Sequence, residues 1–390
     1  MVTVDNNKLI SHVTLDGRID STNASLVESQ IFEKIDKKAE KVIIDAENLE
    51  FISSAGLRVI LKLKKIYKDV EIIGVSSDIY EIFEMTGFTE MINIQKGYRK
   101  LSVDGCEVLG EGSNGIVYRY DPEIVVKVYR NANALDEIKR ERRLARTALI
   151  LGIPTAIPFD VVKVGNSYGS VFELLNAKSF SKLIAEEPEN KDKYITEFVD
   201  LLKRIHSTKV NPEDMDDMKT VAIGWAEFLA DYLPKEQGDK LTALIKAVPE
   251  RHTMLHGDYH TNNVEMQNGE VLLIDMDTLS YGHPIFELAS MYLSFVGFGE
   301  IDHTITKKFM KLPYETTGYI WHKSLSLYLG TDDENRLNEV AEKAMVLGYA
   351  RLMRRTIKRI GFDDPEGKKV IDNCKNHLSE LFKKVNTLDF

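Results

Sequence analysis

The chain has 390 residues, enough for two or three domains, and its apolar content of 43% can supply more than one core. Its formal net charge is −10, and no segment is basic enough to form a nucleic-acid surface. The two cysteines, Cys106 and Cys374, allow neither a disulfide framework nor a cysteine-based zinc site, which favours a reducing cytoplasm.

The sequence predicts neither a signal peptide nor a membrane-spanning helix. Residues 1–5 contain no basic region followed by an apolar stretch. The longest uncharged runs, Thr147–Phe159 and Leu288–Gly299, are shorter than the roughly 20 apolar residues that a spanning helix needs. The sequence also contains no internal repeat and no low-complexity tract.

Residues 1–98 are expected to form a small α/β domain. The pattern predicts strands at 8–14, 41–45, 70–75 and 91–94, and helices at 24–38, from about 57 to 68, and at 78–86. The second of these helices carries one apolar stripe at helical spacing, formed by Val59, Ile60, Leu63, Ile66 and Tyr67. Alternating strands and helices are typical of helices packed against a sheet.

Two serines, Ser53 and Ser54, stand at the turn from a strand into that helix. Serine is a good helix cap because its hydroxyl accepts a hydrogen bond from a backbone N–H that has no helical partner. Capping is therefore the plainer interpretation. The alternative is a phosphorylation site, because a helix N-terminus tolerates a phosphate, which would change the surface that a partner meets.

This first segment resembles a STAS domain of the anti-sigma factor antagonist type. The resemblance rests on Leu15–Asp20, the Val42–Asp45 strand and the stretch Phe51–Leu57. In that family the serine two residues before the glycine is the regulatory phosphoserine, which corresponds to Ser54. Many members carry Asp immediately before it, where this chain has Ser53. The resemblance implies a regulatory or partner-binding role for residues 1–98.

A second domain is expected at residues 104–390, after a polar, unpatterned segment near 96–104. It opens with a glycine-rich stretch that contains Gly110, Gly112, Ser113 and Gly115. A similar spacing occurs in dinucleotide-binding folds, but a helix follows it there. Here two strands are expected next, at 116–120 and 124–129. The pattern therefore predicts a flap whose backbone approaches the phosphates of ATP closely.

Lys127 lies among valines in the second of these strands. Such a lysine is either an edge charge that extends to solvent or a buried cation that binds an anion. The upstream glycines favour the second interpretation, in which Lys127 holds the phosphates of ATP. A helix predicted at 133–149 would supply its acidic partner, Glu141, with Glu137 as the alternative. The alternative is that both are ordinary solvent-facing acids.

The most informative stretch is the loop at residues 256–263 and the strand that ends at Ile274-Asp275. The spacing lets Asp258 point at a substrate hydroxyl while Asn263 coordinates a metal. Asn268-Gly269 between two apolar runs predicts a hairpin that would bring Asn263 beside Asp275. Two oxygen ligands suit Mg²⁺, since nucleotide phosphates complete its shell. A surface hairpin rich in Asp is the alternative.

The remainder of the chain is predicted to be mainly helical. After a strand at 171–175, helices are expected at about 190–206, 222–233, 238–247, 286–296, 335–360 and 367–385. The second domain would then have a strand-rich lobe at about 104–175 and a helical lobe at about 176–390.

From about residue 104 to 385 the pattern resembles the aminoglycoside phosphotransferase and choline kinase-like group, distant relatives of protein kinases. The resemblance rests chiefly on His256-Gly257-Asp258, Asn263 and Asp275. It implies an α+β, two-lobed, protein-kinase-like fold. It also implies roles for individual residues: Asp258 as catalytic base or hydroxyl orienter, Asn263 and Asp275 as Mg²⁺ ligands, Lys127 and Glu141 as phosphate-positioning groups, the backbone at Glu173–Leu175 as the adenine site, and His256 as structural support.

Members of that group usually have an aspartate a few residues after a proline, where it supports the catalytic loop. In this chain Glu287 stands in that place, after Pro284. The resemblance implies that Glu287 supports the loop with one additional methylene.

The function predicted from the sequence is the transfer of the γ-phosphate of ATP, with Mg²⁺, to a hydroxyl of a small molecule of the aminoglycoside, amino alcohol or sugar class. Asp277 shares a face with Asp275 if strand alternation continues, and then contacts substrate or a second metal; a turn-forming Asp is the alternative. The acidic excess beyond residue 100 favours a cationic acceptor. Aromatic candidates for a cation site are Trp225, Tyr281, Tyr319 and Trp321, although such residues more often lie in the core.

Two other functions fit parts of the pattern. One is a regulatory, nucleotide-sensing binding protein of the partner-switching type. The presence of Lys127, Asp258 and Asn263 favours an enzyme instead. The other is a protein kinase that acts on Ser54 or on a partner. No activation segment separates residues 274–277 from Pro284, which argues against it.

Overall fold

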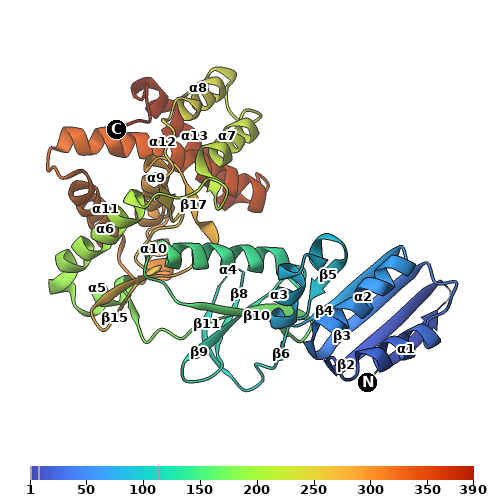
Figure 1. Ribbon diagram of the computed structural model, residues 1–390. Coiled ribbons are helices and arrows are strands. Elements are labelled where there is room, and N and C mark those ends of the chain that lie inside the picture. Colours follow the sequence, from blue (N-terminus) through green and yellow to red (C-terminus); the bar gives the residue numbers. More distant parts are fainter. Residues whose placement is uncertain (1, 8, 113) are drawn as a thin grey trace. The chain divides into compact units, whose positions relative to one another are not determined.

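The computed structural model describes residues 2–7, 9–112 and 114–390, so the predicted phosphate-site residue Ser113 lies outside the described residues. The chain divides into two compact units. The first unit comprises residues 1–102 and 161–166, and the second comprises residues 103–160 and 167–390. Figure 1 shows the elements of both units in chain order.

The first unit is built on a five-stranded sheet with the order β1-β2-β3-β4-β5. Its strands are β1 (Val2–Asn7), β2 (Ile10–Ile19), β3 (Lys41–Ile52), β4 (Asp69–Val75) and β5 (Asn93–Lys96). Its helices include α1 (Ala24–Lys34), α2 (Ser54–Ile66), α3 (Ser77–Met85) and the short 3₁₀ turn η1 (Phe88–Glu90). β1 pairs antiparallel with β2, and the other neighbours pair in parallel.

The parallel pairs are joined through helices, the arrangement expected from the alternation of strands and helices in the sequence. In the first half of β3 every second residue is buried, at Val42, Ile44 and Ala46. The sequence pattern did not predict β1, and the predicted helix at 24–38 ends at Lys34.

The strand-rich lobe of the second unit carries the flap. Its elements include β7 (Glu107–Glu111), β8 (Gly115–Arg119), β9 (Ile124–Tyr129), β11 (Ser167–Glu173) and helix α4 (Leu135–Ile150). These strands have the order β11-β9-β8-β7, so Lys127 lies on a central strand. Strand β10 (Pro158–Val164) begins in this unit, and its residues 161–164 belong to the first unit. The end of β10, at Lys163 and Val164, pairs in parallel with β6 (Lys100–Leu101).

The helical lobe has α9 at its centre. Its helices include α5 (Phe180–Glu186), α6 (Lys191–Ser207), α7 (Met218–Leu229), α8 (Lys235–Lys246), α9 (Ile285–Phe295), α10 (Thr304–Met310), α11 (Tyr314–Leu329), α12 (Glu334–Arg359) and α13 (Pro365–Lys384). Every residue of α9 is buried, which agrees with its nearly uninterrupted apolar sequence, since a helix apolar on all sides belongs in the interior.

Short strands and 3₁₀ turns connect these helices. They include β12 (Lys178–Ser179), β13 (Asp216–Asp217), β14 (Met254–Leu255), β15 (Val264–Gln267), β16 (Glu270–Leu273), β17 (Ser280–Tyr281), η2 (Pro188–Asn190), η3 (Met276–Thr278) and η4 (Gly297–Gly299). Within the described part of the chain, no helix combines the length and apolar character that crossing a bilayer requires.

Candidate active site

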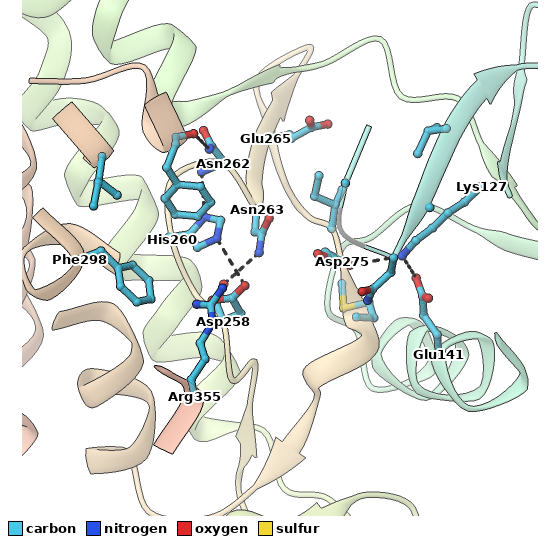
Figure 2. Close-up of a pocket in the computed structure, with 18 of the residues that line it drawn as sticks. Lys127, Glu141, Asp258, His260, Asn262, Asn263, Glu265, Asp275, Phe298 and Arg355 are labelled. Atoms are coloured by element: carbon cyan, nitrogen blue, oxygen red, sulfur yellow. Dashed lines mark hydrogen bonds and ion pairs between the residues drawn. The ribbon is translucent and has the colours of Figure 1, made fainter. Parts of the chain in front are cut away.

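A cleft of about 1060 Å³ opens inside the second unit, and Figure 2 shows the side chains that line it. One wall comes from the strand-rich lobe and includes Gly112, Gly115, Lys127, Glu141, Glu173 and Leu175. The floor comes from the loop and hairpin at residues 258–276 and includes Asp258, Asn263 and Asp275. The remaining wall comes from η4, α10, α12 and α13. The structure therefore brings most of the predicted site residues into one cleft.

Lys127 makes two ionic contacts in this cleft. Its ammonium group lies 2.8 Å from Glu141 of α4 and 3.6 Å from Asp275. Burial by itself would lower the pKa of Lys127, but the carboxylates of Glu141 and Asp275 outweigh it and raise the pKa. Glu137, the alternative partner, is exposed. Lys127 is therefore a positive charge fixed between two carboxylates, at the place where a nucleotide phosphate would add a third anion.

The glycines of the flap differ in what surrounds them, so the absence of a side chain serves a different purpose at each. A Cβ on Gly115 would lie 2.4 Å from the carbonyl oxygen of Val128, so this glycine lets β8 and β9 approach. A Cβ on Gly112 would meet nothing closer than 3.9 Å, and one on Gly110 would meet nothing within 4 Å. Gly112 lines the cleft, whereas Gly110 lies in β7 and is not among the described lining residues. The open space beside Gly112 is where backbone approach to a ligand is sterically free.

Asp258 is held in the loop by backbone and side-chain contacts. Nδ2 of Asn263 donates to the carbonyl oxygen of Asp258 at 3.0 Å, and Nε2 of His260 lies 3.5 Å from its carboxylate. Burial would raise the pKa of Asp258, but His260, Arg351 and His256 outweigh it and lower the pKa to about 2. The carboxylate is therefore ionised at neutral pH and can accept a hydrogen bond from a hydroxyl.

Glu287 supports this loop from beneath. Its carboxylate is fully buried and accepts the backbone N–H groups of His256, Gly257 and Tyr259, the last at 3.3 Å. The ring Nε2 of His256 lies 3.1 Å from the carbonyl oxygen of Ile274, a contact that connects the loop to the residue just after β16. The longer glutamate side chain thus reaches the three backbone donors.

The predicted hairpin is formed by β15 and β16, which pair antiparallel through a turn at Asn268 (φ 53°) and Gly269 (φ 84°). The N–H of Ile274 donates to the carbonyl of Asn263 at 2.9 Å, which holds the two ends of the hairpin together. Asp275 follows with φ 63°, an uncommon backbone conformation for a residue other than glycine. Such outliers gather at functional sites.

The expected strand alternation from Asp275 to Asp277 is wrong. The strand ends at Leu273, and Met276–Thr278 form the 3₁₀ turn η3. The carboxylate of Asp277 accepts a bond from Nδ2 of Asn114 at 3.4 Å, and its carbonyl accepts one from Arg140 at 2.7 Å. Asp277 is not among the described residues that line the cleft.

The protein groups near Asn263 and Asp275 could hold a magnesium ion only if nucleotide phosphates and water supplied the other ligands. The described residues contain no group of three or more His, Cys, Asp or Glu side chains that could hold a metal. Asn263 and Asp275 offer one amide and one carboxylate, the small protein share that Mg²⁺ accepts when phosphates and water supply the rest. Burial, Asp275 and Glu141 raise the pKa of Asp277 to about 7. The raised pKa reflects burial together with repulsion between neighbouring carboxylates, and a bound divalent cation would reduce that repulsion.

The structure does not bring the aromatic candidates for a cation site into the large cleft. Tyr281 lines a separate cavity of about 140 Å³ and meets His252 edge-on, with ring centroids 5.5 Å apart. The described lining of the large cleft contains none of Trp225, Tyr319 and Trp321. Trp225 packs under the guanidinium of Arg351, and Tyr319 bonds to Asp192 at 2.8 Å. Trp225 and Trp321 are buried in the core, the alternative that the sequence left open, whereas Tyr319 is exposed.

Several cleft residues were not predicted. They are His260, Asn262, Glu265, Phe298, Asp302, Phe309, Arg355 and Arg359. His260 stands two residues after Asp258, so its proximity could have been inferred from the loop motif. Arg355 and Arg359 lie four apart on a distant helix, a spacing that predicts a shared helix face but not what that face meets.

Comparison with known proteins gives two matches along the chain. The profile of the phosphotransferase enzyme family (APH) matches residues 106–305, and that of the STAS domain matches residues 1–101. Over 84 residues the chain is 31% identical to BtrV of Bordetella bronchiseptica, named as a candidate anti-sigma factor antagonist. That alignment covers 20% of this chain and 72% of the relative.

Solved structures align with this chain at low sequence identity and with TM-scores below 0.5. An ADP-bound aminoglycoside phosphotransferase, APH(2'')-Ib, aligns with a TM-score of 0.49 and 16% identity, over 77% of this chain and 98% of its own. A choline/ethanolamine kinase family protein from Mesorhizobium loti aligns with a TM-score of 0.45 and 14% identity, over 72% of this chain and 88% of its own. Both resemblances predicted from the sequence are confirmed by the family profiles, and the chain belongs to the phosphotransferase enzyme family and carries an N-terminal STAS domain.

Proposed function

We propose that the second domain transfers the γ-phosphate of ATP to a hydroxyl of a small molecule, with Mg²⁺ as cofactor. The observation that carries this proposal is the placement of Lys127, paired with Glu141, in the same cleft as Asp258 and Asp275. Phosphoryl transfer needs two groups from the protein: a fixed cation that binds the phosphates and a carboxylate that orients the acceptor hydroxyl. The acceptor belongs to the aminoglycoside, amino alcohol or sugar class.

In this mechanism Lys127 binds phosphate oxygens, and Glu141 keeps its ammonium group in place. Asn263 and Asp275 would hold Mg²⁺, which neutralises charge on the phosphates. Asp258 accepts a hydrogen bond from the acceptor hydroxyl and aligns its oxygen with the γ-phosphorus. A new O–P bond forms as the bond from the γ-phosphorus to the bridging oxygen breaks, ADP leaves, and the hydroxyl proton passes to Asp258. Because the transition state is loose, alignment contributes more than the basicity of a carboxylate with a low pKa.

The adenine site in this proposal is the segment Glu173–Leu175 at the end of β11. The N–H of Glu173 donates to the carbonyl of Ile157 at 3.0 Å, and that of Leu174 donates to Glu123 at 2.7 Å. Both groups are therefore used within the protein. The N–H of Leu175 is the donor we assign to the adenine edge.

The proposal divides the chain into a STAS-like regulatory or partner-binding domain at residues 1–98 and a catalytic domain at 104–390. Ser54 is exposed at the start of α2, where a kinase can reach its hydroxyl. We place the protein in the cytoplasm, where ATP is available, and the unpaired Cys106 and Cys374 are consistent with a reducing compartment.

The test is a phosphate-incorporation assay with [γ-³²P]ATP over a panel of small hydroxyl compounds, with and without EDTA. Asp258→Asn keeps the size of the side chain and removes its charge. We expect EDTA to abolish transfer and Asp258→Asn to lower kcat by about 10²–10⁴-fold, with ATP affinity by calorimetry nearly unchanged. Equal turnover in the variant would remove Asp258 from the mechanism. Failure of the wild-type protein to bind Mg-ATP would refute the proposed function.

A further inference from the structure

The wall of the cleft formed by α12 carries two arginines, Arg355 and Arg359, one helical turn apart. Figure 2 shows the side chain of Arg355 beside Asp258, and the Asp258 carboxylate acts electrostatically on the guanidinium. The guanidinium of Arg355 stands over the ring of Phe298, 5.3 Å from its centroid. Among the described residues no carboxylate forms an ion pair with Arg355 or Arg359. Two cations that form no ion pair among the described residues thus line the wall near which the acceptor hydroxyl would lie.

Basic residues near a helix C-terminus have a simpler explanation, because they compensate the helix dipole. Lys358 and Arg354 fit that explanation: both turn to the other side of α12 and stand over Phe228, at 5.0 and 5.8 Å from its centroid. Arg355 and Arg359 instead line the cleft. Burial, Arg359 and Arg351 lower the pKa of Arg355, which reflects positive charge that is not fully compensated.

Of the acidic groups on this wall, Asp302 is engaged elsewhere. The carboxylate of Asp302 accepts the N–H and the hydroxyl of Thr304, both at 2.9 Å. Glu366 lies in the first turn of α13, where the helix dipole favours an acid. Figure 2 shows Glu265 beyond Asn263, on the side away from Arg355.

The neutral polar groups of this wall are also paired. The hydroxyl of Thr356 donates to the carbonyl of Leu352 at 2.9 Å, and Asn373 donates to Glu300 at 3.2 Å. The charged side chains that this wall leaves for a ligand are therefore Arg355, Arg359 and Glu366, two cations and one acid.

We infer that the acceptor carries an anionic group, a phosphate or a carboxylate, which Arg355 and Arg359 bind while its hydroxyl meets Asp258. Guanidinium groups suit this ligand because their donors match two anionic oxygens at once. The inference rests on the proposed function and narrows its acceptor to anionic compounds, chiefly of the sugar class. It reverses the expectation of a cationic acceptor, which came from the overall acidic excess of the domain rather than from the charges that line the cleft.

The experiment uses compounds that differ in charge at a similar size. Ribose is compared with ribose 5-phosphate, and glycerol with glycerol 3-phosphate and glycerate; choline and kanamycin represent cationic acceptors. Each is tested for phosphate incorporation from ATP. Each anion, and inorganic phosphate, is also titrated calorimetrically into the protein saturated with ADP and Mg²⁺, so that the nucleotide site is already filled. The phosphate and carboxylate members distinguish the two kinds of anion.

The variants are Arg355→Gln, Arg359→Gln and their combination. Arg336→Gln is the matched control, because Arg336 lies on the same helix in an exposed ion pair with Glu339, outside the cleft. We expect an anionic member to bind, and the double variant to weaken that binding at least tenfold, with Arg336→Gln unchanged. In turnover, Arg359→Gln should raise the KM for the acceptor more than it lowers kcat.

Three results would overturn the inference: no anion binds to the wild-type protein, an anion binds equally well to the double variant, or choline or kanamycin is phosphorylated in preference to every anion. The last result would leave the proposed phosphotransferase function intact. Calorimetry needs no turnover, so it decides the inference even where no compound on the panel accepts phosphate.

Discussion

Lys127 and Asp275 lie 3.6 Å apart and join the strand-rich lobe to the helical lobe across the cleft. Lys127 is positioned by a central strand and Asp275 by the end of a hairpin, so separate elements of the fold place the two residues. This ion pair compensates both charges in the protein without ligand. Under the proposed function, Lys127 would exchange its contact with Asp275 for a phosphate, and Asp275 would exchange Lys127 for the metal ion.

The first prediction concerns Lys127. Lys127→Ala leaves the buried Glu141 without its cation and the nucleotide without its phosphate contact. We expect kcat/KM for ATP to fall by about 10²-fold or more, since one fixed charge in a partly desolvated site has that order of effect. Steady-state kinetics against ATP measures this. Lys139→Ala, an exposed change on α4, is the control. A nucleotide complex with its phosphates far from Lys127 would refute the assignment.

The second prediction concerns Glu287. Glu287→Ala would leave the buried N–H groups of His256, Gly257 and Tyr259 without their acceptor, and we expect a loss of roughly 3–5 kcal/mol in unfolding free energy. Glu287→Asp keeps the charge but shortens the reach, so it should retain the fold and lose part of the activity. Denaturant unfolding and turnover of the two variants separate these effects. If Glu287→Ala unfolds like the wild type, Glu287 does not hold the loop.

Local signals predicted much of this site. The Asn-Gly pair fixes a hairpin turn, and the loop spacing places Asp258 and Asn263 within one segment, so both could be inferred from neighbouring residues. The partner of Lys127 also followed from helical spacing, which puts Glu141 on the buried face of α4 with Ile138. In each case the informative residues are close in sequence.

Features that depend on tertiary contacts were not predictable in this way. Helix α11 was missed because its buried side includes Thr317, Ser324 and Ser326 beside Ile320 and Trp321, so no apolar stripe marks it. Arg355 and Arg359 were missed because nothing near them in the sequence says which part of the lobe α12 faces. Asp277 was placed wrongly because the strand ends at Leu273 and Asp275 takes a positive φ before the turn η3, and the sequence pattern does not carry that information.

The third prediction concerns pH. His283 is buried; its Nδ1 accepts the N–H of Ile285 at 3.2 Å, and its Nε2 lies 3.1 Å from Asp389. Burial and Arg251 lower the pKa of His283 to about 4, with His206 also disfavouring the cation and Asp389 favouring it. A histidine pKa depressed on folding means that its full contribution to stability is present above the unfolded value and is lost as the pH falls toward the folded value.

We therefore expect the unfolding free energy to fall by up to roughly 3 kcal/mol through His283 between about pH 6.5 and 4. Denaturant unfolding across that range measures it. His283→Gln should flatten this part of the profile, whereas His322→Gln, at an exposed site on α11, should not. An identical slope in His283→Gln and the wild type would contradict the assignment.

The fourth prediction separates the two serines at the start of α2. Oγ of Ser53 accepts the N–H of Gly56 at 3.4 Å and caps the helix, whereas Ser54 is the first helical residue and is exposed. We expect Ser53→Ala to lower the unfolding free energy by about 0.5–2 kcal/mol and Ser54→Ala to leave it nearly unchanged.

Phosphate should be found on Ser54, because its hydroxyl is accessible and the N-terminus of a helix stabilises added negative charge. Mass spectrometry of protein from its native cell tests this, with Ser54→Ala as the control. If no condition yields phosphate at Ser54, or if Ser54→Ala destabilises the domain as much as Ser53→Ala does, then Ser54 is a structural residue and the regulatory role of residues 1–98 requires another site.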